Sequence, residues 1–255
     1  MTEQHGHDPE HQSGPEPIDI SEKGRRGATP ISLDRRLFMR FTAYGGCSDP
    51  APVIDALTAA GVVGALYLEV GDPTGVGLAV VNEDPDYFVD DLRVLLNREP
   101  FANLARKEEF EMFGRTYAIG YESDLEHVLF SRPIERITDP ALRWAVWYPL
   151  QRTKGFAALD AGHQRQILAE HGTLGHRFGS AGLAHDIRLA CHGLDKHDND
   201  FIVGLVGAEL HPLSAVVQAM RGTEQTSQYL DSLGPFFVGR VAWQGRGAIP
   251  DGSPE

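Results

Sequence analysis

Apolar and polar positions along the chain alternate between the period of a strand and the period of a helix. From residue 37 onwards, the first half predicts strand, helix, strand, strand, helix and strand at 37–41, 53–60, 63–70, 75–81, 88–95 and 110–121. Turn residues separate these segments, since Gly61 ends the first helix and Gly71-Asp72-Pro73-Thr74 joins two strands. The first half therefore has the order βαββαβ.

The second half of the chain repeats this order. Strands are expected at 144–148, 187–191, 201–206 and 236–241, and helices at 159–171 and 213–220. Short echoes support an internal duplication, because Gly77-Leu78 and Pro100-Phe101 correspond to Gly204-Leu205 and Pro235-Phe236. Two such units predict an α+β fold in which two ferredoxin-like βαββαβ repeats form a dimeric α+β barrel within one chain.

Domain boundaries follow from the same patterns. Residues 35–135 and 136–245 are the two expected halves, and residues 246–255 form a short tail. Residues 1–34 are rich in Gly, Pro, Glu and His and contain hardly any large apolar side chains, so we expect a disordered polar tail. We interpret its first three histidines as solvated rather than as a metal site: His5, His7 and His11.

Composition and charge exclude several classes of partner. The formal net charge of −13 argues against DNA or RNA, since phosphate recognition needs clustered Lys and Arg. No apolar run approaches the roughly 20 residues of a membrane span, and the polar N-terminus lacks the apolar segment of a secretory signal. Cys47 and Cys191 are too few for a disulfide framework, so we expect a reduced, cytoplasmic protein without a membrane partner.

Three side chains of the second half indicate a bound cofactor. Tyr148 stands near the end of a predicted strand, and Arg152 follows four residues later. His171 lies on the apolar side of the next predicted helix, on one face with Ile167 and Leu168. A phenol, a fixed positive charge and a neutral imidazole suit a buried haem-type cofactor. A core histidine bonded to a carbonyl group is the simpler interpretation of His171 taken alone.

Glu224 follows the last predicted helix of the same half. Its carboxylate could accept the proton of the outer imidazole nitrogen of His171, which would fix the tautomer and strengthen the other nitrogen as a donor to a metal. Taken alone, Glu224 is more simply interpreted as a solvated charge at a helix end.

Several segments together resemble the chlorite dismutase and coproheme decarboxylase superfamily. The resemblance covers roughly residues 144–240, with the motifs in the family's order, whereas the first half is similar in layout only. These motifs are Trp147-Tyr148-Pro149-Leu150-Gln151-Arg152, Glu170-His171-Gly172, Gly193-Leu194-Asp195, Asp200-Phe201, Met220-Arg221 with Glu224, and Gly234-Pro235-Phe236-Phe237-Val238-Gly239. The resemblance implies the two-ferredoxin fold, haem bound by the C-terminal half, and a homopentamer. By the same resemblance, His171 is the proximal ligand of the haem iron and Glu224 is its hydrogen-bond partner.

Coproheme decarboxylases of this superfamily use their substrate as the cofactor. The resemblance implies that hydrogen peroxide oxidises bound Fe-coproporphyrin III, that two propionates become vinyl groups, and that the product is haem b. Tyr148 would carry the oxidising equivalent, in a Tyr-Pro-x-x-(Lys/Arg) signature that Arg152 completes. Arg152 would hold a propionate as a carboxylate. We therefore expect a haem-dependent oxidoreductase, and specifically a coproheme decarboxylase.

Chlorite dismutase, which converts chlorite to chloride and O2, is the second enzymatic hypothesis. Enzymes with this activity place an arginine over the iron. Arg188 falls at that position when the alignment starts from Asp200-Phe201, whereas Asp186 falls there when it starts from Gly193-Leu194-Asp195.

Other candidates for the distal residue remain open, namely His185 and His192. Tyr148 favours decarboxylation, because the chlorite enzymes do not need this tyrosine. A haem or coproheme carrier without turnover is the alternative from another class of protein.

Overall fold

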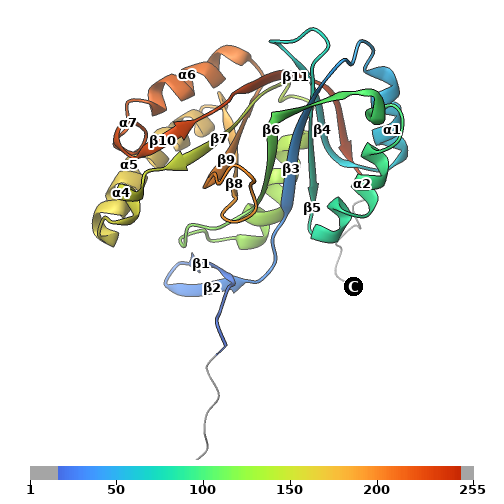
Figure 1. Ribbon diagram of the computed structural model, residues 1–255. Helices are drawn as coiled ribbons and strands as arrows, with labels where there is room; N and C mark the ends of the chain where they lie inside the picture. The colour runs from blue at the N-terminus through green and yellow to red at the C-terminus, as the bar shows by residue number, and fades with distance from the viewer. Residues whose placement is uncertain (1–16, 248–255) are drawn as a thin grey trace, which may run out of the picture.

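A closed barrel forms the centre of the molecule (Figure 1). The structure, a computed structural model, describes residues 17–247. Its large sheet has nine strands in the order β10-β7-β11-β4-β5-β3-β6-β8-β9, and β9 also pairs with β7, which closes the barrel. β10 pairs with the end of β7 that β11 leaves free. The strands are β3 (Phe38–Gly45), β4 (Val63–Glu69), β5 (Val76–Asn82), β6 (Ala105–Arg115), β7 (Trp144–Arg152), β8 (His185–Ala190), β9 (Phe201–Gly207), β10 (Leu230–Leu233) and β11 (Phe237–Arg246).

Helices cover the barrel at two opposite ends in Figure 1, with α1 and α2 at one end and α4 to α7 at the other. Because each half contributes strands and helices in the order βαββαβ, the predicted α+β fold of two ferredoxin-like repeats is confirmed. The helices are α1 (Ala51–Ala59), η1 (Pro85–Phe88), α2 (Asp91–Leu96), η2 (Phe101–Asn103), the π-helical turn η3 (His127–Ser131), α3 (Arg132–Thr138), α4 (Lys154–Ala157), α5 (Ala161–Ser180), α6 (Leu210–Met220) and α7 (Glu224–Gln228).

Alternate residues of each strand fill the barrel interior. Phe41 of β3, Trp147 of β7 and Phe237 of β11 belong to one buried cluster, in which Phe41 stacks on Trp147 with ring centroids 5.3 Å apart. On each strand, the residues that alternate with these interior residues point outward, because successive side chains of a strand face opposite sides. Tyr148, the neighbour of Trp147, therefore belongs to a separate cluster beneath the C-terminal helices.

Gly77 and Gly204, the corresponding glycines of the two repeats, have a packing role. A Cβ atom on Gly204 would come within 2.5 Å of the indole ring of Trp147, its cross-strand partner. A Cβ atom on Gly77 would similarly come within 2.5 Å of the ring of Phe237. Each half thus leaves out a side chain at the same point, which makes room for a large aromatic ring inside the barrel.

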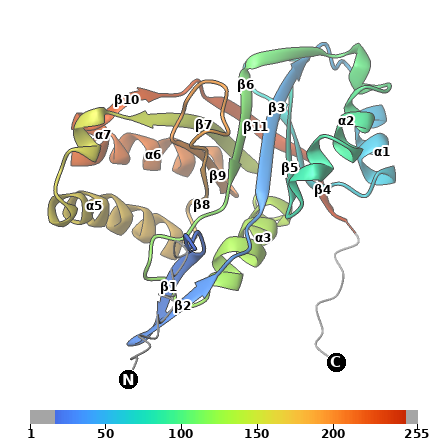
Figure 2. The same cartoon turned by 60° about the horizontal axis from the view of Figure 1, so that its bottom comes forward.

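The predicted disordered tail is wrong for residues 22–33, which form a hairpin of β1 (Glu22–Arg26) and β2 (Thr29–Leu33). Figure 2 shows this hairpin outside the barrel, on the side where α3 lies. Ile31 and Leu33 pack against a buried cluster that includes Leu129 of η3, and the carboxylate of Glu22 forms an ion pair with Arg115 at 2.6 Å. These contacts join segments about a hundred residues apart, so the local composition gave no sign of them. The three early histidines lie outside the described residues.

Several predicted element bounds need correction. The helix expected to end at His171 continues to Ser180, and the helix expected after Pro85 is divided into η1 and α2. The strand expected at 110–121 is instead β6, which begins at Ala105 and ends at Arg115. Its first residues are polar yet pair with β3, so hydropathy did not reveal them. The segment from η3 to α3, which links the halves, was not predicted.

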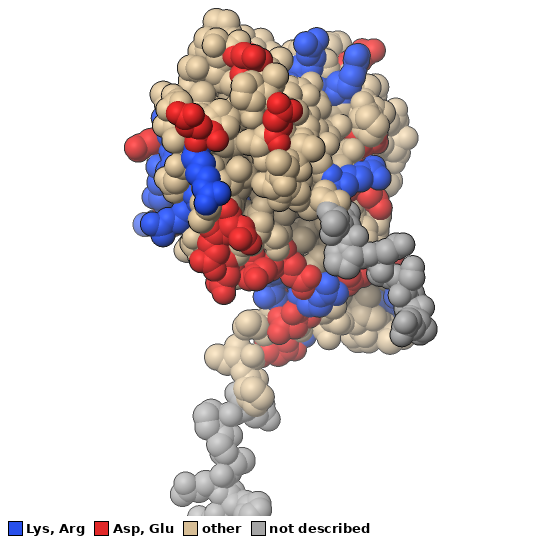
Figure 3. Space-filling model, turned by 90° about the vertical axis from the view of Figure 1, so that its right-hand side faces the viewer, with Lys and Arg blue, Asp and Glu red and all other residues tan. Residues whose placement is uncertain are grey.

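The surface carries the chain's excess of acidic side chains, and both cysteines are buried. Figure 3 shows the end of the molecule that carries α1 and α2, where acidic side chains gather in the lower part and basic ones are scattered. Cys47 and Cys191 are both buried and free. Among the helices of residues 17–247, none combines the length and the apolar content needed to cross a bilayer.

Candidate functional site

His171 lies in the middle of α5, which begins just after Asp160. The Asp160 carboxylate accepts hydrogen bonds from the backbone N–H groups of Gly162 and His163, an arrangement that caps the helix. Of the 20 residues of α5, all within the described chain, Ile167 alone is fully buried. A helix packed closely on a sheet would bury several side chains of its apolar stripe. The inner face of α5, where the half-buried His171 stands one turn after Ile167, is therefore not tightly packed.

The hydrogen bonds around His171 identify its tautomer. Its Nδ1 lies 3.3 Å from Oγ1 of Thr223. The Thr223 hydroxyl has two acceptors for its own proton, the carbonyl of Met220 at 2.8 Å and Oγ1 of Thr226 at 3.3 Å, so its oxygen is left to accept from the imidazole. Nδ1 therefore carries the imidazole proton, and Nε2 keeps the lone pair that a metal ligand requires.

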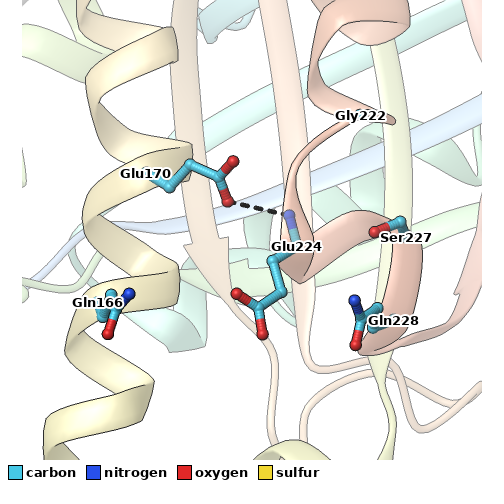
Figure 4. Close-up of a pocket in the computed structure, with 6 residues that line it drawn as sticks. All are labelled: Gln166, Glu170, Gly222, Glu224, Ser227 and Gln228. Carbon is cyan, nitrogen blue, oxygen red and sulfur yellow. Dashed lines mark hydrogen bonds between the residues drawn. The ribbon is translucent and has the colours of Figure 1, made fainter.

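Glu224 does not occupy the position predicted for it. The carboxylate of Glu224 lies 3.5 Å from Nε2 of His163, and its backbone N–H donates to the Glu170 carboxylate at 3.0 Å (Figure 4). The structure thus places the hydroxyl of Thr223, the residue before Glu224, at Nδ1 of His171. The reason is local: Thr223 is the N-cap of α7, and Glu224 is already in the first turn of that helix.

Two arginines lie close enough to His171 to influence its charge. The pKa of His171 is lowered, first because burial disfavours the imidazolium and then because Arg152 and Arg188 repel it. Asp186 and Glu170 act in the opposite direction. The net effect keeps the ring neutral at physiological pH. These effects on the pKa also mean that His171 of α5 lies near the charged side chains of β7 and β8.

Tyr148 and Arg188 stand in one row across the sheet beneath α5. Both pair with Val203 of β9, Tyr148 from β7 and Arg188 from β8, so all three side chains share the outer face. Tyr148 is 8% exposed, and its ring packs on Phe236 with centroids 4.7 Å apart. Burial, together with the negative charge of Asp186, raises the pKa of the Tyr148 phenol. The phenol therefore keeps its proton at neutral pH.

Arg152 is a partly buried cation between two aromatic rings. Its guanidinium carbon lies 4.5 Å from the ring centroid of Phe156 and 4.6 Å from that of Phe201. Within residues 17–247, its Nε has no hydrogen-bond partner and no carboxylate lies within ion-pair distance. Burial lowers the pKa of Arg152, which nevertheless remains charged at neutral pH. A buried donor without a partner is costly, and an anionic ligand would satisfy it.

Asp186 and Arg188, the alternatives for the distal position, are both on the outer face of β8 and bind each other. Nε of Arg188 lies 2.8 Å from Oδ2 of Asp186, while Nη1 of Arg136 from α3 lies 3.1 Å from Oδ1. His185, at the start of β8, lies on the opposite face from Arg188. His192 follows the end of β8, and its Nδ1 lies 3.3 Å from the Asp200 carboxylate.

Tyr117 is a residue of this region that the sequence interpretation missed. It follows β6 in a loop, and its ring packs against Phe201 with centroids 5.4 Å apart. The guanidinium of Arg188 lies 6.0 Å from the Tyr117 ring. Burial raises the pKa of the Tyr117 phenol, while Arg188 and Arg152 oppose this effect. Because Tyr117 fell inside a predicted strand, no pattern in the chain indicated that it contacts this face.

Two surface openings lie where α5 meets α6 and the α7 region. One of about 440 Å³ is lined by residues of α5 and of the α7 region, with Glu170 and Glu224 facing it (Figure 4). A second of about 340 Å³ lies between α5 and α6. The described chain contains no group of three or more His, Cys, Asp or Glu side chains placed to hold a metal ion. A single imidazole such as His171 would suit a metal that a porphyrin already coordinates.

Comparisons with known proteins identify similar folds and a family. The chain is similar to a structure described as a novel heme-binding protein from Thermus thermophilus, with 20% identity, 82% of this chain and 92% of that chain covered, and a TM-score of 0.64. It is also similar to chlorite dismutase from Candidatus Nitrospira defluvii carrying lysine in place of an arginine, with 15% identity, 83% and 93% covered, and a TM-score of 0.64. A search of curated proteins gives no match.

A sequence model of the family described as chlorite dismutase matches residues 96–242, more than half of the chain. The matched segment includes β7, α5, β8, β9 and α7, which carry the candidate site. The protein belongs to the chlorite dismutase family.

Proposed function

We propose that this protein is a haem-dependent oxidoreductase and, more narrowly, a hydrogen-peroxide-dependent coproheme decarboxylase that makes haem b. Family membership and the likeness to a protein described as heme-binding support the cofactor. The narrower proposal is carried by the buried phenol of Tyr148, beside which stands Arg152, a partly buried cation with no carboxylate of the described chain within ion-pair distance of its side chain. Arg152 follows Tyr148 by four residues. A porphyrin propionate would give this guanidinium a direct anionic partner, in addition to the nearby carboxylate of Asp200, which bonds to the backbone N–H of Arg152.

The residues fit the proposed ligand in type and protonation. When bound, iron coproporphyrin would supply a metal that reacts with peroxide and two propionates that are converted to vinyl groups. Nε2 of His171 is the unprotonated donor for the metal, because Thr223 keeps the proton on Nδ1. The acceptor is a neutral hydroxyl, so His171 has less anionic character than a carboxylate partner would give it.

Arg152 and Tyr148 have complementary roles in the proposal. Arg152 holds a propionate as a carboxylate, and the rings of Phe156 and Phe201 restrict the guanidinium to one position. Tyr148 is protonated at neutral pH like any phenol, and burial raises its pKa further. The phenol would give one electron and its proton to the oxidant that hydrogen peroxide supplies at the bound porphyrin, and would recover both from the propionate side chain as that side chain loses CO2.

The test compares Tyr148→Phe with the unchanged protein. Both are loaded with iron coproporphyrin and titrated with hydrogen peroxide, and the porphyrin products are identified by mass. Tyr148→Phe should bind the porphyrin normally and lose the first decarboxylation. Tyr87→Phe is a matched control, because Tyr87 packs on Phe88 in the other half of the molecule. Haem b formed at the normal rate by Tyr148→Phe would show that these roles are wrong.

Chlorite dismutation is the second candidate, and the position of Arg188 favours it. Arg188 shares the outer face of the sheet with Tyr148, beneath the helix that carries His171. This candidate predicts oxygen release from chlorite by the haem-loaded protein and its loss in Arg188→Ala. Stoichiometric binding without a product from either peroxide or chlorite would identify a carrier instead. A cytoplasmic homopentamer remains part of the proposal, and light scattering of the purified protein tests the number of subunits.

A further inference from the structure

The carboxylate of Asp186 is shared by two arginines from different parts of the fold. Arg188 stands two residues later on β8, and its Nε lies 2.8 Å from Oδ2 of Asp186. Arg136 comes from α3, the helix between the two halves, and contacts both the side chain and the backbone carbonyl of Asp186. Asp186 therefore holds Arg188 on one side and is itself held by Arg136 on the other.

The surrounding charge keeps this carboxylate ionised and leaves the cluster positive. Arg188, Arg136 and Arg132 all lower the pKa of Asp186, against the effect of its burial. Arg132 is one helical turn before Arg136, and burial together with the charge of Arg136 lowers its pKa. Three cations thus surround Asp186, and the carboxylate of Glu122 also acts on Arg132 and Arg188 in the direction that raises their pKa. Any further anion near Arg188 competes with Asp186 for the same guanidinium.

We propose that Asp186 is a specificity-determining residue that retains Arg188 and so makes the site favour a neutral oxidant over an anionic one. This inference rests on the proposed function. To grip an anion with its Nε edge, Arg188 must leave Asp186. Hydrogen peroxide carries no charge, so its binding does not require the pair to separate. The same pair accounts for the choice between the two candidate reactions, because chlorite is an anion.

The expected effect is moderate, since the side chains of Arg188 and Asp186 are 36% and 40% exposed and solvent weakens their attraction. Releasing Arg188 should strengthen anion binding by about twofold to fivefold, which corresponds to the coupling of a partly exposed ion pair.

The experiment uses the ferric haem-loaded protein at fixed pH and ionic strength, with azide as the anionic probe and imidazole as the neutral one. Absorption titrations compare the unchanged protein with Asp186→Asn, Arg188→Gln and the double variant. Asp186→Asn is isosteric and keeps an acceptor for Arg136, and thermal unfolding checks that it folds. It should bind azide about twofold to fivefold more tightly, and its affinity for imidazole should not change. In the Arg188→Gln background, the same substitution should change azide affinity by less than about twofold.

Two results would overturn the inference while leaving the proposed function intact. One is an azide affinity that Asp186→Asn leaves unchanged or weakens. The other is a gain that persists without Arg188, because that gain would come from the removed charge alone. Failure of the unchanged protein to bind haem or iron coproporphyrin would instead overturn the proposed function, and the inference with it.

Discussion

Replacing Arg152 with methionine separates a binding role from a structural one. Methionine keeps an unbranched apolar stem between the rings of Phe156 and Phe201 but removes the charge. Removing the charge loses two cation–π contacts of about 0.5–1 kcal/mol each. It also removes a buried donor without a partner, which costs about 1–3 kcal/mol in the unchanged protein. The two effects nearly cancel, so the free energy of unfolding of the ligand-free protein should change by less than about 1 kcal/mol.

Porphyrin affinity should change much more than stability in Arg152→Met. A charge-assisted hydrogen bond to a propionate contributes about 1.5–3 kcal/mol, so the dissociation constant for iron coproporphyrin should rise about 10- to 150-fold. The affinity for haem b, which lacks the two propionates that are converted, should fall less. Absorption titrations with both porphyrins measure affinity, and urea unfolding followed by circular dichroism measures stability.

Arg40→Met is the matched control for this prediction. Arg40 is a partly buried arginine that already has partners, namely Glu111 at 2.8 Å and Thr42 at 3.1 Å. Its replacement should lower the free energy of unfolding by about 1–3 kcal/mol and leave porphyrin affinity unchanged. If Arg152→Met instead loses several kcal/mol of stability and binds coproheme as before, Arg152 is a structural residue and the reasoning fails.

Three further predictions concern pH, packing and the hairpin. The pKa of His171 is lowered, so protons compete for Nε2 only below about pH 6.5. The spectrum of the loaded protein should therefore stay constant from about pH 7.5 to pH 6.5, and a loss of ligation that begins within this range would contradict the lowered pKa. Gly204→Ala should lower the free energy of unfolding, measured in urea, by about 1–3 kcal/mol, because the new Cβ atom would clash with Trp147. Gly172→Ala is the control, since a Cβ atom there meets open space and should not destabilise the protein. Equal effects of the two substitutions would contradict the packing argument. Glu22→Gln weakens two interactions of the Glu22 carboxylate, the ion pair with Arg115 and the hydrogen bond from the backbone N–H of Ala118. Hydrogen exchange at Ala118 should therefore become roughly tenfold faster. An unchanged rate would mean that the hairpin does not hold the segment after β6 in place.

Periodicity predicted the barrel well because half of each strand faces a closed interior. Trp147 and Ile187 face that interior, and the alternation they create is visible in the sequence. The hairpin was missed for the opposite reason, since Glu22 depends on Arg115, far away in the chain. Gly172 was taken as the end of a helix, but α5 continues through it because nothing in the structure requires a turn there.

The positions of the candidate site residues could be predicted where their spacing along one strand determines them. They could not be predicted where two neighbouring side chains compete for the same partner. Tyr148 and Arg152 follow from the position of one strand. The partner of His171 was displaced by one residue, because the start of α7 decides whether Thr223 or Glu224 reaches the ring. Asp186 and Arg188 could not be separated by alignment, since residues two apart on a strand face the same way, and the structure shows them bound to each other.

Closure of the barrel prevents the C-terminal half from standing alone. β11 pairs with β4 of the N-terminal half along Gly239 to Arg246, and β8 meets β6 through Ala190 and Arg115. A polypeptide truncated to the second repeat would expose a long bare edge on β11, which invites strand exchange between copies and aggregation. The first repeat supplies none of the proposed iron ligands. Its strands nevertheless cover the edge of the second repeat, which carries the proposed ligand, and so protect that repeat from aggregation.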